Sequence, residues 1–214
     1  MKRVLWVVVG MLMMGGVGLS WSYKVYAGEN AGVTVTLDLE KEEEGEAGDQ
    51  GHLTVQNVGP GETVVLSIYG NGLSNVYSYA IEVQFDTTKV VYVEGGATNV
   101  GFAEFDVFSA AGLFVLAPDP ENPSIIGAAS ALLPKPTADK APDGDGKLLV
   151  WMKFTTRASM QTSDEVRFSV VKAQFKGLDE VLDDVPSNQL PMVFLNFAEA
   201  VEFSHWGQIK ALFR

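Results

Sequence analysis

The side chains that most often carry enzyme chemistry are scarce in this sequence. It contains no cysteine and only two histidines, His52 and His205, which lie far apart along the chain. The absence of cysteine excludes thiolate metal sites and thiol nucleophiles, and neither histidine has the spacing of a zinc motif. A Gly-x-Ser-x-Gly elbow and a phosphate-binding loop are also absent. These absences predict that the protein is not an enzyme.

The 27 acidic residues leave one catalytic alternative open. A pair of carboxylates is the machinery of glycoside hydrolysis, and sequence alone does not exclude such a pair. Here the acids lie mainly in turns and in the run 40–49. A run of this kind is more often a solvated loop than an active site.

One acidic cluster could hold a metal ion. Asp139, Asp143 and Asp145 lie close in sequence, and residues 143–146 read Asp-Gly-Asp-Gly. Asp-Gly pairs are common in tight hairpin turns, so we expect a turn here and predict no cofactor. A structural calcium ion is the alternative, although the segment lacks the ligand spacing of an EF-hand.

The stretch 77–85 is the main candidate for a binding surface. Its side chains alternate between apolar and polar, as in a strand with one buried face. Four apolar side chains are expected to face the core: Tyr79, Ile81, Val83 and Phe85. Four others are expected to face outward and to contact a partner: Ser78, Ala80, Glu82 and Gln84. The alternative is a solvated sheet face with no function.

Trp151 is the fifth candidate binding residue. In the strand expected over 148–156, Val150, Met152 and Phe154 fit the inward phase, which leaves Leu149 and Trp151 outward. An exposed tryptophan can anchor a protein partner or stack on a sugar ring. A loop that covers Trp151, or an error in the strand phase, is the alternative.

Residues 1–27 have the plan of a secretory signal. Lys2 and Arg3 precede an apolar run over 4–19, and the segment ends at the small residue Ala27. Basic, apolar and small-residue regions in this order are typical of a signal peptide, so we expect cleavage after Ala27. A retained membrane anchor is the alternative, but the run is short and glycine-rich for a spanning helix.

The charge of the chain limits its partners. The formal net charge is −12, and loss of the three basic residues within 1–27 would make it −15. Nucleic-acid binding depends on basic residues that neutralise phosphates, so we exclude it. We expect a secreted protein, in the extracellular space or at the cell surface, that meets a membrane only through its signal segment.

The pattern of segments predicts an all-β sandwich. Short apolar or alternating runs are separated by turn residues, and they recur at 33–39, 62–69, 77–85, 147–156, 165–175 and 191–197. Many short strands without a long helical period indicate a sandwich, which we place at 33–196. In the tail 197–214, Trp206, Ile209 and Phe213 have the spacing of a short amphipathic helix.

Four motifs carry a family resemblance. Residues 59–63 read Gly-Pro-Gly-Glu-Thr, and residues 85–90 read Phe-Asp-Thr-Thr-Lys-Val. Residues 143–156 read Asp-Gly-Asp-Gly-Lys-Leu-Leu-Val-Trp-Met-Lys-Phe-Thr-Thr, and residues 166–175 form a further alternating strand. In order and spacing these motifs resemble the cohesin domain family over roughly 33–196.

The resemblance implies a jelly-roll sandwich of about nine strands and a non-catalytic extracellular module. Cohesins bind dockerin domains and assemble enzymes for polysaccharide breakdown, so a dockerin is the implied partner. In the best-known cohesins, Asn and Asp stand at the positions that match Ser78 and Ala80. Because Ala80 lacks that carboxylate, recognition of the best-known kind is in doubt. A carbohydrate-binding module of the same fold that binds polysaccharide, or a structural or adhesive surface domain, is the alternative.

Overall fold

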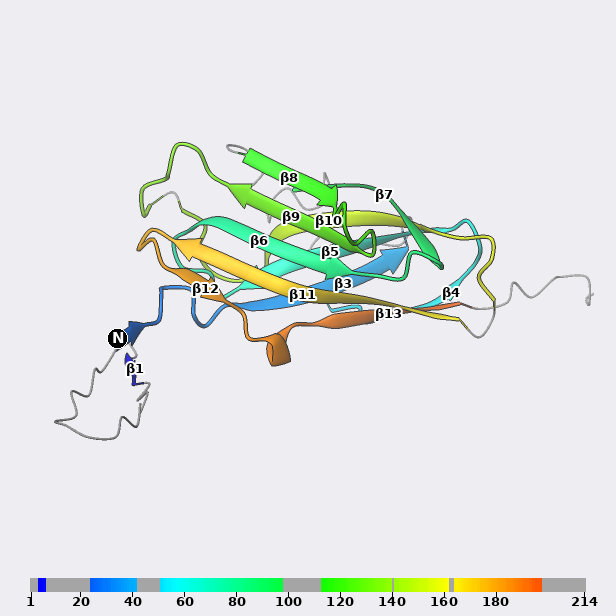
Figure 1. Cartoon of the computed structure of the whole chain (residues 1–214), viewed down its shortest axis with the longest axis horizontal. Helices are drawn as coiled ribbons and strands as arrows, with labels where there is room; N and C mark the ends of the chain where they lie inside the picture. The colour runs from blue at the N-terminus through cyan, green and yellow to red at the C-terminus, as the bar shows by residue number, and fades with distance from the viewer. Residues whose placement is uncertain are drawn as a thin grey trace, which may run out of the picture.

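Two β-sheets stack face to face and enclose the core of the protein (Figure 1). The computed structural model describes residues 4–6, 24–41, 51–97, 113–139, 141–161 and 164–197. The first sheet has four antiparallel strands in the order β3 (Thr34–Lys41), β5 (Thr63–Asn71), β10 (Lys147–Thr156) and β7 (Val90–Gly96).

The second sheet has seven strands. Six follow in the order β4 (Thr54–Val58), β13 (Met192–Phe197), β11 (Glu165–Gly177), β6 (Val76–Gln84), β9 (Ile125–Ala131) and β8 (Leu113–Pro118). The seventh, β12 (Leu182–Asp184), also pairs with β11. One 3-10 turn, η2 (Ser187–Gln189), lies between β12 and β13. All pairs are antiparallel except β13 with β4, which is parallel.

The predicted fold class is confirmed. The two sheets contain eleven strands where about nine were expected, and one of the additional strands, β12, has only three residues. The six apolar or alternating runs predicted as strands all contain strands, because each can bury one side against the facing sheet.

The N-terminal region adds a separate two-stranded sheet, β1 (Val4–Trp6) with β2 (Lys24–Tyr26). Within the described residues, no helix is long and apolar enough to cross a membrane. The remainder of the predicted signal segment lies outside the described residues, as does the helix predicted within 197–214.

An aromatic cluster joins the two sheets at the centre of the core. The ring of Phe154 on β10 lies 4.8 Å from that of Phe168 on β11, 5.0 Å from Phe85 and 5.9 Å from Tyr92 (centroid to centroid). Phe154 and Phe168 are fully buried. Tilted and edge-on aromatic pairs add to the stabilisation that burial provides.

The predicted phase of β10 is correct at its C-terminal end and wrong at one position. Val150, Met152 and Phe154 are buried in the main core as expected. Leu149 was expected outward but is also fully buried there. A register shift between Leu148 and Val150 is the reason, because a β-bulge inserts an extra residue and breaks the alternation.

The segment 143–146 is a turn. Gly144 and Gly146 have positive φ angles of 94° and 66°, and Gly144 forms a β-bridge with Leu73. The Asp145 carboxylate accepts a hydrogen bond from the backbone N–H of Gly72 at 2.6 Å. Asp145 therefore stabilises the contact between this turn and the turn after β5.

We expect Phe154→Ala to lower the free energy of unfolding by about 3–5 kcal/mol, because it opens a cavity between the sheets. Chemical denaturation measures this change. Val93→Ala is the control, since Val93 is 51% exposed on β7 and should change stability by less than about 0.5 kcal/mol. Equal effects of the two variants would contradict the role given to Phe154.

Candidate functional site

The outward side of β6 lies in the middle of a broad face formed by β8, β9, β6 and β11, which we call the β6 face (Figure 1). The predicted alternation along β6 is confirmed. The inward side chains of β6 and of Phe85, which follows it, are all buried: Tyr79, Ile81, Val83 and Phe85. Its outward side chains all reach the surface: Ser78, Ala80, Glu82 and Gln84.

The centre of the β6 face is built from small residues. Ala80 lies opposite Ala129 of β9, and Ala129 lies opposite Val115 of β8. The neighbouring positions on β9 are Gly127 and Ala131. Because strands lie about 4.8 Å apart and these side chains are short, the surface here is flat. Val115 is 49% exposed and adds an apolar side chain at the β8 edge of this surface.

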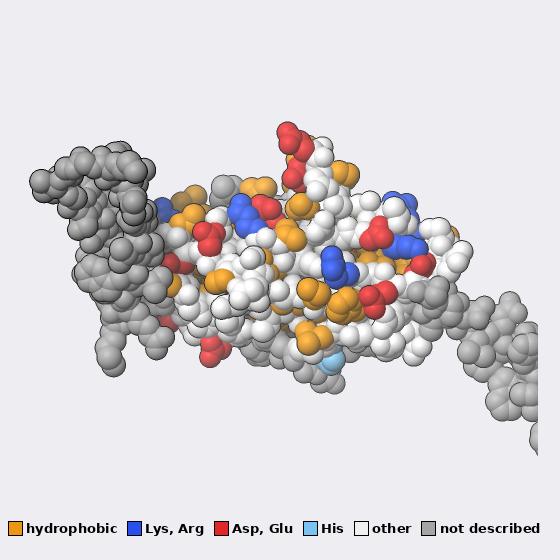
Figure 2. Space-filling model, turned by 60° about the horizontal axis from the view of Figure 1, so that its bottom comes forward, with side chains coloured by type: hydrophobic (Ala, Val, Ile, Leu, Met, Phe, Trp, Pro, Cys, Tyr) orange, Lys and Arg blue, Asp and Glu red, His pale blue; other side chains and the backbone are white. Residues whose placement is uncertain are grey.

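Paired polar side chains flank this flat centre. Glu82 lies opposite Lys172 of β11, and the Lys172 ammonium is 3.0 Å from the Glu82 carboxylate. Gln174 lies opposite Ala80 and donates to the carboxylate of Asp184 at 2.6 Å. Figure 2 shows hydrophobic side chains with charged ones between and around them on the side of the molecule near β11 and β13.

A charged cluster marks one end of the face. The Glu180 carboxylate accepts a hydrogen bond from the Tyr77 hydroxyl at 3.0 Å and forms ion pairs with Lys176, at 2.9 Å, and with Lys135. Bonds from Lys135, Lys176 and Tyr77 lower the pKa of Glu180 to about 2. The cluster therefore keeps Glu180 ionised and the two lysines oriented.

A hollow of about 260 Å³ marks the other end, with this lining: Gln84, Phe85, Asp86, Glu165, Arg167 and Ser169. Within the described part of the chain, the buried hydroxyl oxygen of Ser169 has no hydrogen-bond partner. Met192 of β13 lies opposite Ser169 and is 46% exposed. The hollow thus offers an unused hydroxyl beside an exposed apolar side chain, which the sequence alone did not indicate.

Trp151 does not join the other four predicted binding residues. It lies on β10 in the four-stranded sheet, on the side away from the core, opposite Ser67 and Gly96. It is half-buried and packs against Tyr69 and Leu148, which are fully buried. A side chain at Gly96 would come within 3.2 Å of the indole nitrogen. The indole is therefore part of a second, smaller apolar cluster.

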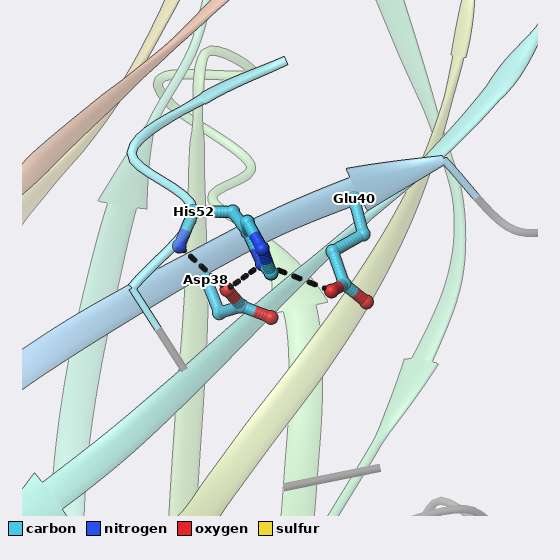
Figure 3. A group of neighbouring side chains, drawn as sticks. All are labelled: Asp38, Glu40 and His52. Atoms are coloured by element: carbon cyan, nitrogen blue, oxygen red, sulfur yellow. Dashed lines mark hydrogen bonds and ion pairs between the residues drawn. The ribbon is translucent and has the colours of Figure 1, made fainter. Parts of the chain in front are cut away.

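A second group of chemically active side chains lies on β3, and the sequence analysis did not identify it (Figure 3). The Nδ1 atom of His52 is 3.0 Å from the Asp38 carboxylate and 3.0 Å from that of Glu40. Asp38 and Glu40 are two residues apart on a strand, so both point to its outer side. The spacing of Asp38 and Glu40 was the one sign of this group in the sequence. No nearby residues indicate that the chain brings His52 back beside β3.

Asp38 is the most buried member of the group, with 1% of its side chain exposed. It accepts hydrogen bonds from the backbone N–H groups of Gly51 and His52 at 3.1 and 2.9 Å. Burial raises the pKa of the Asp38 carboxyl, while the hydrogen bonds and the charge of His52 oppose this shift. The carboxylate thus holds residues 51–52 against β3.

Asp38, Glu40 and His52 could also bind a metal ion. Their ligand atoms lie within 4.8 Å of one another, and they are the one such group among the described residues. One imidazole and two carboxylates suit zinc or another divalent transition metal. The hydrogen bonds within the group account equally well for its geometry, so we interpret it as a structural contact.

The fold resembles that of cohesin modules of known structure. The sixth cohesin of scaffoldin B from Acetivibrio cellulolyticus, solved in complex with a dockerin, is 16% identical, with a TM-score of 0.53, over 78% of this chain and 99% of that chain. A type II cohesin domain from the cellulosome of the same organism is 13% identical, with a TM-score of 0.53, over 77% and 95% of the two chains.

A third similar structure comes from outside cellulosomes. The non-cellulosomal cohesin of the archaeon Archaeoglobus fulgidus is 10% identical, with a TM-score of 0.50, over 81% of this chain and 97% of that chain. No family model and no curated protein matches the sequence. At these identities the structural similarity establishes the fold, and the chain is a jelly-roll sandwich of the cohesin type.

The lowered pKa of Glu180 can be tested by titration at acidic pH. A lowered pKa means that the stabilisation from Glu180 is complete above its ordinary value of 4.5 and is lost as the pH falls toward about 2. NMR titration of the side-chain carboxyl should give a pKa near that lower value. In Lys135→Ala the pKa should rise toward 4.5, and an unchanged value would contradict the assigned contacts.

We expect His52→Ala to lower the free energy of unfolding by about 1–3 kcal/mol, since Asp38 would lose a hydrogen-bond partner in a buried position. Thermal unfolding with and without Zn²⁺ distinguishes the two interpretations of the group. A structural contact predicts no change of Tm with Zn²⁺. A rise in Tm that disappears in His52→Ala would instead establish a metal site.

Proposed function

We propose that this protein is a secreted, non-catalytic module that binds another protein through its β6 face. The observation that carries the proposal is the flat row of Ala80, Ala129 and Val115, flanked by the Glu82–Lys172 pair. An apolar centre with a polar rim is the usual anatomy of a protein–protein interface. The cohesin-type fold adds support, because one similar structure was solved with a dockerin bound.

A dockerin-type domain is the proposed class of partner. The best-known cohesins carry a carboxylate at the position that Ala80 occupies here, so this chain would bind its partner without that contact. Close packing over Ala80 and Ala129 would replace it, since short side chains let a partner approach the sheet. Lys172, which is paired with Glu82, and Gln174, which donates to Asp184, would supply hydrogen bonds to partner side chains at the rim of this surface.

The N-terminal sequence and the charge support the proposed location. The signal-like segment 1–27 and the net charge of −12 support secretion, and we propose an extracellular or cell-surface setting that is linked to polysaccharide breakdown. The domain would span 33–196, with 197–214 as a tail. The scarcity of basic residues speaks against a nucleic-acid partner.

Direct binding of carbohydrate is less well supported. A sugar platform needs exposed aromatic rings in a line. Among the described residues, the exposed large hydrophobic side chains are all aliphatic: Leu53, Val91, Val93, Val115, Leu133, Val171, Leu182 and Met192. Trp151, the aromatic candidate, is half-buried against Tyr69 and Leu148.

We expect Ala80→Arg to reduce the affinity for the partner at least tenfold, because a long charged side chain would stand in the flat centre of the interface. The mature protein is used to capture partners from the native secretome and from a panel of purified dockerin domains, and affinities are then measured by calorimetry. A glycan array is run in parallel.

Val93→Arg is the matched control, because Val93 is exposed on the opposite sheet and its replacement should leave binding unchanged. Equal affinity of wild type and Ala80→Arg for every captured partner would refute the β6 face as the binding surface. Binding to glycans alone would move the protein into the carbohydrate-binding class.

A further inference from the structure

The segment that follows the predicted cleavage site is held tightly by the sandwich. The backbone N–H of Gly28 donates to the Asp183 carboxylate at 2.9 Å, across 155 positions of sequence. The N–H of Asn30 donates to the other oxygen of Asp183, also at 2.9 Å. Asp183 lies on β12 and is 7% exposed, so both oxygens of a nearly buried carboxylate are directed at this segment.

Further contacts fix the same segment on both sides. The N–H of Glu29 donates to the carboxylate of Asp179 at 2.9 Å. The Asn30 side chain, which is buried, donates to the carbonyl of Ser74 at 3.0 Å and accepts from the N–H of Ser74 at 2.9 Å. The position of the Gly28 nitrogen is therefore determined by the surrounding fold.

Glycine at position 28 is required by this close approach. A β-carbon there would lie 2.2 Å from one oxygen of Asp183 and 2.8 Å from the β-carbon of Val181. Gly28 is not among the glycines with a positive φ angle, so its backbone conformation is open to other residues. The space beside the carboxylate, and not the backbone angle, selects glycine.

Among the residues that the structure describes, no positively charged side chain accompanies the carboxylate of Asp183. In the described part of the chain, no lysine or arginine forms an ion pair with Asp183, and its acceptors are used by neutral N–H groups. A buried carboxylate without a counter-charge is unfavourable. The missing feature is one positive charge within hydrogen-bond distance of Asp183.

Cleavage after Ala27 would create that charge at the required place. Hydrolysis breaks the bond between the Ala27 carbonyl carbon and the Gly28 nitrogen; water provides the hydroxyl of the new Ala27 carboxyl group and a proton for the new amine. The amine takes up a further proton near neutral pH, because α-amino groups have pKa values of about 7.7–8.0. The Gly28 nitrogen, 2.9 Å from Asp183, then carries a full positive charge.

We propose that Asp183 and its neighbours form a binding site for the chain's own mature N-terminus, so that removal of residues 1–27 completes an ion pair between the Gly28 ammonium and Asp183. The inference rests on the proposed secretion and cleavage, and it is independent of the partner that the β6 face binds. Signal removal then does more than release the protein, because it stabilises the contact of the N-terminus with β12.

The first test compares two starting points of the chain. Residues 28–214 and residues 27–214 are produced from fusions that a protease removes without leaving extra residues. The added Ala27 moves the ammonium one residue outward, by about 3.8 Å, and puts a neutral amide beside Asp183. We expect the chain that begins at Gly28 to have a folding equilibrium constant at least tenfold larger, as measured by chemical denaturation at pH 7.

Asp183→Asn in both chains completes a double-mutant cycle. The difference between the two starting points should disappear when the carboxylate is absent. The proposal is overturned if the two starting points are equally stable with Asp183 present, or if the same difference persists when the Asp183→Asn substitution has removed the carboxylate.

The second test uses a pair of glycines. In the chain that begins at residue 28, Gly28→Ala should lower the folding equilibrium constant at least tenfold. Gly32→Ala should have little effect, because a β-carbon at Gly32 meets nothing within 4 Å. If Gly28→Ala does not fold, the comparison of the two starting points still decides, since both of those chains keep every residue of the mature wild-type sequence.

Mass spectrometry of the protein secreted by its native host tests the cleavage itself. A mature chain that begins at Gly28 is the expected result, and any other first residue would overturn the proposal. None of these measurements involves a binding partner. A failure of partner capture would therefore count against the β6 face and leave the N-terminal ion pair standing.

Discussion

The packing of Phe154 between the two sheets is the contact on which the rest of the structure depends. Its ring meets Phe168 of β11 and lies beside Phe85, which directly follows β6. These contacts fix which side of β6 and β11 is turned inward. Since side chains in a strand alternate, the same contacts determine that Ala80, Glu82 and Gln174 face the solvent together. The arrangement of side chains on the β6 face is thus a consequence of the core.

The sequence predicted local features well and relations between distant segments poorly. The alternation along 77–85 was sufficient to assign both sides of β6, because period-two patterning reports burial directly. The same reasoning was wrong at Leu149, where a bulge places an extra residue in the core. A bulge leaves no mark in the pattern of apolar residues, so the error could not be detected from the chain alone.

In the candidate sites, too, local features were predictable and contacts between distant segments were not. Four of the five predicted binding residues share the β6 face, but their neighbours on β9 and β11 became known only from the strand pairing. The meeting of Asp38 with His52, and of Gly28 with Asp183, depends on segments that return to each other in space. The prediction that Trp151 faces away from the main core was correct. The packing of Tyr69 beside it could not be predicted from the sequence.

The parallel pairing of β4 with β13 has a consequence for how the chain acquires its structure. Thr54 pairs with Phe194, so this edge of the seven-stranded sheet closes only after β13 has been synthesised. Pairing between segments so far apart in the sequence raises the contact order, and topologies of high contact order fold slowly. The N-terminal strand β4 therefore stays without its partner until β13 is available, although the two are neighbours in the finished sheet.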